Sequence, residues 1–363
     1  MRLFQNSVLY PAYRARLDKL RKPDWSFAQQ LAAFLGDGYG APHFLLPVIA
    51  GDPSAFFTNS DDGVLQRQWA REHGLPDGTK MEHILLAQIE EHRAEVFYNL
   101  DPMRYQSDFV RRLPSAVRWS VAWRAAPSPG ADFGAYSAML CNFPAILRGY
   151  QQRGWRAKYF VPSYHPVLEP FASQSERPVD VIFVGGYSRH HRRRAELLES
   201  VAALQDRYKV EFHLDRSRLT RLAESIPGRL LPLVSHRRPK VIRSISRPGL
   251  FGLDLYQALS RAKIVLNGAI DMAGEDRGNL RCFESMSCGA LMVSDRGEYP
   301  RGMIDGETML TYRSPQDAVN VIQAALVNTD RRRAIAANGT RLMKTEYSKA
   351  RQWELFVQII GEL

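Results

Sequence analysis

The sequence predicts an α/β protein of two successive domains, each a doubly wound parallel sheet with helices on its faces. Three observations predict this fold class. Short apolar runs of strand length alternate with helix-length segments, which is the pattern of βα units. A stretch with four prolines, 162–178, interrupts the alternation, and a second series of apolar runs follows directly. The length of 363 residues is sufficient for two domains that each have a core.

The first series of predicted elements lies before the proline-rich stretch. Its strand-length runs are rich in β-branched and aromatic residues, and Asp101-Pro102 and Gly154 end two of its segments because Pro and Gly disfavour continued helix or strand. The predicted strands are 3–9, 94–102, 117–123, 138–141 and 158–161, and the predicted helices are a stretch through Leu17 and Leu20, 26–36, 81–93 and 144–153.

The second series has the rhythm of a doubly wound domain. Its predicted strands are 179–186, 209–214, 229–234, 263–268 and 290–295, with helices at 191–205, 217–225, 252–261, 280–287, 315–327, 329–346 and 348–361. We therefore expect an N-terminal domain over 1–165, a hinge over 166–178, a C-terminal domain over 179–345, and a final helix over 346–363 near the domain junction. Two such domains would place a ligand-binding cleft between the carboxyl ends of their sheets.

Composition excludes several protein classes. With 45% hydrophobic and 24% charged residues, the chain is an ordinary globular protein and not a disordered one. Its three cysteines, Cys141, Cys282 and Cys288, lack a C-x-x-C pair, which argues against a zinc site or a disulfide framework. No apolar run approaches the roughly 18 residues of a membrane span, and the first residues lack the apolar stretch of a signal peptide. We expect a cytoplasmic protein.

The charge balance is positive, with 49 Lys and Arg against 38 Asp and Glu, a surplus of 11. Such a surplus suits nucleic acid, an anionic membrane surface or a polyanionic small molecule. The densest basic segments are 189–194 and 229–247, either of which could also be a solvated surface. No zinc-finger, basic-zipper or aromatic RNA-binding pattern accompanies them, which disfavours nucleic acid. Peripheral contact with the inner membrane face stays open as an expectation for 229–247.

One chemical motif is FVGGYSRHHRRR at 183–194. A buried strand ends in two glycines that allow close approach of a ligand, and a basic turn then opens a helix. Helix amides and arginines there would suit a diphosphate. The motif is neither G-x-G-x-x-G nor a P-loop, so a Rossmann dehydrogenase or an NTPase is disfavoured. An ordinary strand exit with surface arginines is the alternative. The residues concerned are Gly185, Gly186, Arg189, His190 and Arg193.

A second motif, RGNLRCFESMSCGALMVSD at 277–295, places Asn279 and Arg281 just before Glu284, near the start of a helix. A carboxylate there can accept hydrogen bonds from the vicinal hydroxyls of a sugar. The competing interpretation is that Glu284 only complements the helix dipole.

A third motif opens the helix at 252–261. The loop that contains Phe251, Gly252 and Leu253 can present backbone groups to a planar base, and Gly252 leaves room for it. A hydrophobic loop that covers the sheet is the alternative.

The order of these motifs carries a resemblance. VIFVGG, GLFGLDLYQALSRAKIVLN, GNLRCFESMSCGALMVSD and DGETMLTYRSPQDAV together resemble the bacterial glycosyltransferase-like family that is named after a spore maturation protein. More broadly, the chain resembles group 1 glycosyltransferases of the two-Rossmann B fold. The resemblance covers about 179–350 well, and 94–168 more loosely through NLDP, CNFP and YHP.

The resemblance implies a glycosyltransferase, of the kind used in polysaccharide biosynthesis, that holds a nucleotide-diphosphate sugar on its C-terminal domain. Gly185 and Gly186 would adjoin the diphosphate, 251–253 the base and Glu284 the ribose, while Arg281 or Arg193 would meet the diphosphate. Group 1 enzymes have a second Glu eight positions before the ribose-binding one. This sequence has Asp276 there, with Glu275 beside it, and so departs from the family pattern.

The acceptor would be a glycan, a lipid-linked glycan or a protein, bound mostly by the N-terminal domain. Inverting transfer needs a base for the acceptor hydroxyl, and the sequence does not distinguish it from retaining transfer. Without a D-x-D motif, we expect no metal and no cofactor besides the donor. The alternative function is a catalytically idle nucleotide- or glycan-binding module. Candidate bases are Asp101, His165, Glu275 and Asp276, and candidate acceptor-binding residues are Asn6, Ser7 and Tyr10.

Overall fold

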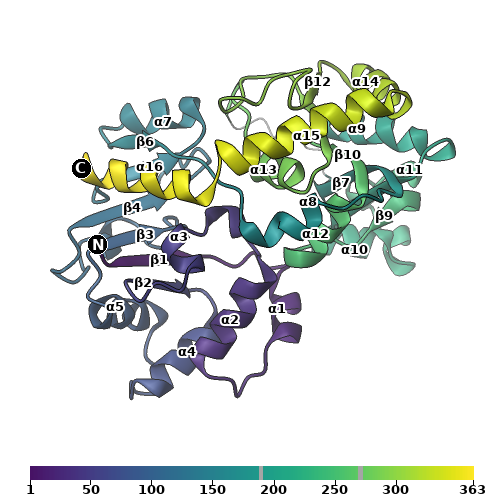
Figure 1. Cartoon of the computed structure of the whole chain (residues 1–363). Coiled ribbons are helices and arrows are strands. Elements are labelled where there is room, and N and C mark those ends of the chain that lie inside the picture. The colour runs from purple at the N-terminus through teal and green to yellow at the C-terminus, as the bar shows by residue number, and fades with distance from the viewer. Residues whose placement is uncertain (188–190, 269–272) are drawn as a thin grey trace. The chain divides into compact units, whose positions relative to one another are not determined.

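A computed structural model of the chain describes residues 1–187, 191–268 and 273–363. They form two compact α/β units, shown in Figure 1. Unit 1 comprises Met1–Ser163 and Lys349–Leu363, and unit 2 comprises Tyr164–Ser348. The predicted α/β class is confirmed, with a parallel sheet in each unit. The stretch 166–178 lies within unit 2, and the final helix lies within unit 1.

Unit 1 is built on a six-stranded parallel sheet in the order β2-β1-β3-β4-β5-β6. β1 is flanked by β2 and β3, so the carboxyl ends of these three strands lie side by side. The first strand ends at Ser7, two residues earlier than predicted, and its last two residues are Asn6 and Ser7. The strands are β1 (Leu3–Ser7), β2 (Ala55–Asn59), β3 (Val96–Asn99), β4 (Trp119–Trp123), β5 (Ala138–Cys141) and β6 (Ala157–Tyr159).

The helices of unit 1 follow their sequence signals. In α2, Ser26 and Gln29 form a capping box, and the helix ends at Gly38, whose φ of +67° suits glycine. The α-helices are α1 (Arg14–Leu20), α2 (Phe27–Asp37), α3 (Leu46–Ile49), α4 (Gly63–Glu72), α5 (Met81–Glu91), α6 (Ser107–Val110), α7 (Pro144–Gln151) and α16 (Lys349–Gly361), and η1 (Ala41–His43) is a 3-10 turn.

The C-terminal helix α16 is anchored in unit 1 by two buried polar side chains. The Lys349 ammonium donates to the carbonyl oxygens of Ala41 and Pro42 at 2.9 and 3.2 Å. The Gln352 amide donates to the Val161 carbonyl at 2.8 Å. Burial lowers the pKa of Lys349, and the backbone carbonyls supply the hydrogen bonds that a buried ammonium needs. These contacts explain why the chain returns to unit 1 after leaving unit 2.

Unit 2 has a second six-stranded parallel sheet, in the order β12-β11-β10-β7-β8-β9. The central strands β7 and β10 are fully apolar over most of their length, as a sheet covered on both faces requires. β12 was not among the predicted strands. The strands are β7 (Val179–Gly186), β8 (Val210–Asp215), β9 (Ser246–Arg247), β10 (Ala262–Leu266), β11 (Leu291–Asp295) and β12 (Leu310–Tyr312).

The predicted strand over 229–234 is wrong. This segment contains parts of two 3-10 turns, η4 (Pro227–Leu230) and η5 (Val234–His236), and the edge of the sheet is formed instead by β9. Pro232 cannot donate to a strand ladder, and Leu230 and Leu231 are exposed instead of packed in the core. An apolar run here is therefore no indication of a buried strand.

Six helices of unit 2 lie within a few residues of their predicted bounds, whereas the two short helices at 169–172 and 240–245 were not predicted. Over the described ranges no helix is both long and apolar enough to cross a bilayer. The helices are α8 (Glu169–Ala172), α9 (Arg192–Ala202), α10 (Arg218–Glu224), α11 (Lys240–Ile245), α12 (Gly252–Ser260), α13 (Leu280–Ser287), α14 (Pro315–Val327) and α15 (Thr329–Thr345), and the other 3-10 turns are η2 (Pro166–Leu168) and η3 (Ala203–Asp206).

Candidate functional site

A buried amide pair joins the carboxyl ends of β1 and β3 in unit 1. The Asn6 side chain donates to Asn99 Oδ1 at 2.8 Å and accepts from the Ser60 backbone amide at 3.0 Å. Asn99 in turn donates to the Tyr136 hydroxyl at 2.7 Å. Both asparagines are fully buried. Asn6 is a predicted acceptor-binding residue, but the hydrogen bonds of its side-chain amide connect the ends of three strands.

The other two predicted acceptor residues lie at the end of β1. Ser7 is the last residue of the strand and is buried. Tyr10 has an exposed side chain, while its backbone amide donates to the Tyr39 hydroxyl at 3.1 Å. Tyr10 is thus the one of the three predicted residues that presents a side chain to solvent at this edge of the sheet.

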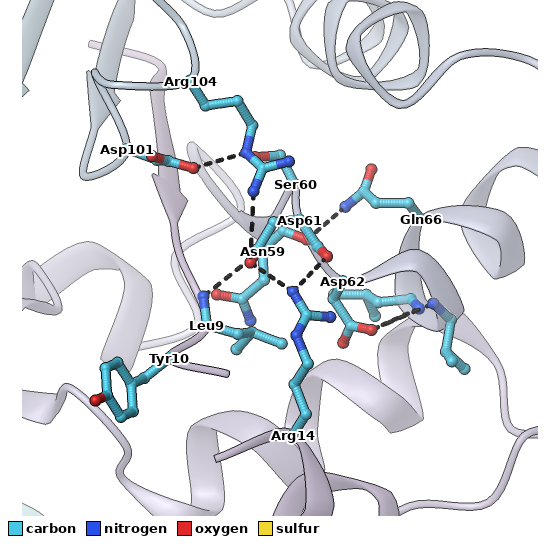
Figure 2. Close-up of polar contacts among 12 residues, drawn as sticks. Leu9, Tyr10, Arg14, Asn59, Ser60, Asp61, Asp62, Gln66, Asp101 and Arg104 are labelled. Carbon is cyan, nitrogen blue, oxygen red and sulfur yellow. Dashed lines mark hydrogen bonds and ion pairs between the residues drawn. The ribbon is translucent and has the colours of Figure 1, made fainter. Parts of the chain in front are cut away.

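Beside them lies an ion-pair cluster centred on Asp61, two residues after the end of β2. Its carboxylate accepts from the Leu9 backbone amide at 3.0 Å and from the Arg14 guanidinium at 2.7 Å. An Arg104 nitrogen lies 4.0 Å from the same carboxylate, and Arg104 also donates to Asp101 at 2.9 Å. Figure 2 shows Arg14 and Arg104 reaching Asp61 from two sides.

The electrostatics of this cluster are those of a buried anion between two accessible cations. The Asp61 side chain is 2% exposed, whereas those of Arg14 and Arg104 are 41% and 51% exposed. Burial raises the pKa of Asp61, and its bond from the Leu9 amide and the charge of Arg14 oppose that rise. The arrangement presents two oriented guanidinium groups, which suit hydroxyl or anionic groups of a ligand.

The sequence pointed to Asp101 at this edge but not to Asp61, Arg14 or Arg104. The local signal was the run AFFTNSDD, in which a short apolar strand is followed by polar residues as at the end of β3. The Asp101 carboxylate is engaged by Arg104, and its backbone amide donates to Asn99 Oδ1 at 2.9 Å.

In unit 2, an arginine-rich cavity of about 440 Å³ opens at the carboxyl ends of β10, β11 and β12, next to the start of α9. Its lining includes five arginines, Arg193, Arg194, Arg277, Arg296 and Arg313. Three acidic residues, Glu196, Glu275 and Asp295, also line it. An excess of guanidinium groups in a concave site suits a polyanion such as a diphosphate.

The arginines of this cavity differ in how they are held. Arg277 is ion-paired with Asp295 and donates to the Gly274 carbonyl at 2.7 Å, and Arg194 donates to the Gly268 carbonyl. Among residues that the structure describes, no carboxylate lies within ion-pair distance of the guanidinium groups of Arg193, Arg296 and Arg313, although the Arg313 backbone amide donates to Asp317 at 2.8 Å. The cavity thus combines fixed arginines with arginines that lack an acidic partner.

The predicted residues of the second motif come together around α13. Asn279 is the N-cap residue of this helix, and its side chain makes no capping bond but exchanges two hydrogen bonds of 3.0 Å with Asn267, which follows β10. Arg281 donates to the Glu284 carboxylate at 2.7 Å. Burial raises the pKa of Glu284, and the charge of Arg281 opposes this. Glu284 is therefore a buried acceptor whose partner within the protein is a cation.

The two acids that precede α13 occupy different environments. Glu275 lines the arginine-rich cavity, whereas Asp276 is buried beside the backbone of Glu298. His165 caps η2, where its Nδ1 accepts from the Val167 amide at 3.0 Å. This bond requires an unprotonated Nδ1, so His165 has a structural use in unit 2.

The glycine-containing motifs have the expected backbone. Gly185 and Gly186 end β7, and a side chain at 185 would press on the Phe183 ring at 3.1 Å. Gly252 begins α12 with a φ of +55°, which favours glycine, and Phe251 precedes it in extended conformation. Leu253 lies in the first turn. The predicted donor residues Arg189 and His190 lie outside the described residues.

Comparison with known proteins gives a domain match and a fold. Residues 192–358 match the protein family described as glycosyl transferase-like. No curated protein matches the sequence.

Three solved glycosyltransferase structures resemble the whole chain. HepE (Alr3699) from Anabaena in complex with UDP-glucose is 13% identical, with a TM-score of 0.58 and 99% of each chain covered. A glycosyltransferase from Rickettsia africae ESF-5 is 9% identical, with a TM-score of 0.58, over 99% of this chain and 97% of that one. Sucrose-phosphate synthase from Thermosynechococcus elongatus is 12% identical, with a TM-score of 0.54 and 99% of each chain covered.

The protein thus has the two-domain B fold of glycosyltransferases, and its match to the glycosyl transferase-like family covers most of unit 2. This confirms the predicted fold and the broader resemblance to glycosyltransferases of that fold. The narrower resemblance to the family named after a spore maturation protein, and the role of each site residue, stay predictions.

Proposed function

We propose that this protein transfers a sugar from a nucleoside-diphosphate donor to an acceptor hydroxyl. The observation that carries the proposal is the arginine-rich cavity at the carboxyl ends of β10, β11 and β12, inside the domain that matches glycosyl transferase-like proteins. The departing diphosphate develops negative charge as the glycosidic bond breaks, and arginines aimed at it stabilise that transition state. UDP is the first nucleotide to test, since the HepE structure holds UDP-glucose.

The donor would lie across the carboxyl edge of unit 2. Arg193, Arg296 and Arg313 supply positive charge without acidic partners for the diphosphate. Glu284 would accept hydrogen bonds from the ribose hydroxyls, and the turn before α12 would meet the base. We further propose that arginines take the role that a metal has in other transferases, so that transfer needs neither a metal nor a cofactor besides the donor.

The acceptor would lie at the carboxyl edge of unit 1, where open α/β sheets bind ligands. Arg14 and Arg104 would bind its hydroxyl or acidic groups, with Asp61 as the positioning residue that orients both guanidinium groups. Asp101 and Glu275 remain candidates for the base of an inverting reaction, because neither is as deeply buried as Asp276. The acceptor class is a glycan, a lipid-linked glycan or a protein.

A second function, nucleotide binding without turnover, has one observation in its favour. The residue eight positions before Glu284 is Asp276, where the family has a second glutamate. The Asp276 side chain is also buried. An idle binding module would bind a nucleotide through the same arginines but would neither hydrolyse a donor nor transfer its sugar.

The test is calorimetric titration of the full chain with UDP, GDP, dTDP, CDP and ADP, followed by donor hydrolysis assays with the sugar nucleotides of the one that binds. Arg296→Gln and Arg313→Gln are expected to weaken binding about ten-fold each, as the loss of a charge-assisted hydrogen bond predicts. The matched control is Arg333→Gln, an exposed arginine on α15. Absence of binding by all five nucleotides would refute the proposal, and binding without hydrolysis or transfer would favour the idle module.

A further inference from the structure

Residues 216–247, here called the basic segment, concentrate the positive charge of unit 2. The segment contains nine Arg and Lys residues and one acid, Glu224. It connects β8 to β9 at the edge of the sheet through α10, η4, η5 and α11. Figure 1 shows α10, β9 and α11 together at this end of unit 2. None of the proposed donor residues belongs to it.

Large apolar side chains are exposed in the same segment. Of the 14 large hydrophobic residues that are exposed among those the structure describes, six lie within the 16 positions from 219 to 234. Ile226 and Leu230 are the most exposed of them, at 81% and 90%. The others are Leu219, Leu222, Leu231 and Val234. Clustered exposed apolar groups, in contrast to scattered ones, indicate a surface that is covered by a partner.

This apolar cluster is held on an ordered scaffold. The Arg237 guanidinium donates to the carbonyl of Ala223 at 2.9 Å and to that of Gly228 at 2.8 Å, which ties η4 to α10. A Cβ at residue 228 would collide with the Leu222 carbonyl, so glycine permits this close packing. The exposed side chains therefore belong to a compact surface whose backbone is hydrogen-bonded.

A basic pocket of about 250 Å³ adjoins the cluster, with Glu224 from the end of α10 in its lining. Arg238 is buried and paired with Glu224 at 2.7 Å, and Arg247 lies 3.1 Å from Glu211. Arg216 and Arg243 also line the pocket. They are exposed, and no carboxylate of the described part of the chain is within ion-pair distance of either. These two arginines give the pocket a net positive charge that suits a phosphate group.

We propose that the basic segment docks unit 2 onto an anionic phospholipid surface. The exposed apolar side chains would enter the boundary between headgroups and acyl chains, and Arg216 and Arg243 would meet lipid phosphates. Apolar side chains mixed with arginines are typical of interfacial membrane segments, and anionic lipids attract such a charge surplus. Nucleic acid would use the arginines but not the aliphatic cluster, and a second copy of the chain would bring like charges together. The inference does not depend on sugar transfer.

The first test is sedimentation of the full chain with vesicles of phosphatidylcholine alone or mixed with phosphatidylglycerol. We expect binding to the mixed vesicles only. The double variant Arg216→Gln/Arg243→Gln should bind about 25-fold more weakly, from about five-fold for each charge removed near the surface. The control Lys22→Gln/Arg333→Gln removes two exposed charges elsewhere and should bind like the parent. Equal binding by both double variants, or no binding by the parent, would overturn the proposal.

The second test reports contact at the apolar cluster. The emission of an environment-sensitive fluorophore on Leu230→Cys should shift to the blue when mixed vesicles are added. The same label on Val327→Cys should show no shift, because Val327 is the last residue of α14, outside the basic segment, and is 81% exposed. The native cysteines are buried, so the label goes to the introduced thiol. A shift with DNA or RNA but not with vesicles, or a shift that follows protein concentration alone, would assign the surface to nucleic acid or to a second copy instead.

Discussion

Acidification is expected to destabilise unit 1 through one buried histidine. His43, at the end of η1, packs its imidazole against the Trp123 ring with centroids 4.9 Å apart, and its Nδ1 is buried without a hydrogen-bond partner. Burial, with a smaller contribution from the charge of Lys349, lowers the pKa of His43 to about 3. The folded protein therefore keeps this imidazole neutral at pH values where the unfolded chain protonates it.

The magnitude follows from the difference between the two pKa values. Above the unfolded pKa of about 6.5, His43 is neutral in both states and has no effect on the pH dependence. Below it, the unfolded chain binds a proton that the folded chain does not, so the free energy of unfolding falls as the pH falls, until about pH 3. At about pH 5 this loss is about 2 kcal/mol, from about 1.4 kcal/mol for each pH unit.

The assay uses urea unfolding followed by tryptophan fluorescence at about pH 7.5 and about pH 5, the two sides of the unfolded pKa of histidine. All six tryptophans belong to unit 1, so the signal reports on that unit. The variant His43→Phe keeps a ring against Trp123 and should lose about 2 kcal/mol less stability on acidification than the parent. The control His83→Phe changes a half-exposed histidine on α5 and should behave like the parent. The same loss in His43→Phe and the parent would refute the reasoning.

Three further predictions concern the site and the fold. Glu284→Gln should weaken UDP binding at least ten-fold in calorimetry, because a hydrogen bond to a charged group contributes about 1.5–3 kcal/mol, and an unchanged affinity would remove Glu284 from the donor site. Asp61→Ala should lower the urea stability of unit 1 by about 2 kcal/mol by leaving the Leu9 amide without its acceptor, whereas Asp61→Asn keeps an acceptor and should cost less than about 1 kcal/mol. Gly289→Ala should destabilise unit 2 in thermal unfolding by at least about 2 kcal/mol, since φ there is +72° and the new Cβ would lie 2.6 Å from a carbonyl oxygen, while Gly149→Ala, with open space around it, should stabilise unit 1 by about 0.5–1 kcal/mol. Equal effects of the members of either pair would contradict these readings.

The predicted elements were correct where apolar runs had clear boundaries. Strands such as β7 and β11 are mostly buried apolar runs that end at glycine or a charged residue. β2 was missed because its last two residues, Thr58 and Asn59, are polar, so that its apolar run is only three residues long. The segment 229–234 was misjudged for the opposite reason. Its leucines were predicted to lie in the core, but Leu230 and Leu231 are on the surface. The hydrophobicity of a short run does not distinguish a buried strand from an exposed apolar surface.

The two halves of the candidate site differ in how far the sequence could predict them. In unit 2 the predicted residues Asn279, Arg281 and Glu284 lie on one helix, so a local motif contains their spacing. In unit 1, Arg14, Asp61 and Arg104 come from three separate segments. They meet because the strand order β2-β1-β3 places three strand ends side by side. This strand order cannot be predicted from the sequence of any one of the three segments.

The distribution of charge separates the proposed donor site from the proposed membrane surface. Unit 2 has 28 Lys and Arg and 21 Asp and Glu, a surplus of seven, whereas the basic segment alone has a surplus of eight. The rest of unit 2 therefore has about as many acids as bases, although it contains a cavity with five arginines. A site for a diphosphate needs oriented guanidinium groups close to the ligand and does not need a domain with a large net charge. Acidic residues elsewhere in the domain can therefore offset the charge of these arginines. The positive surplus of this unit is thus a property of the edge formed by β8 and β9, where long-range attraction to an anionic surface depends on uncompensated charge.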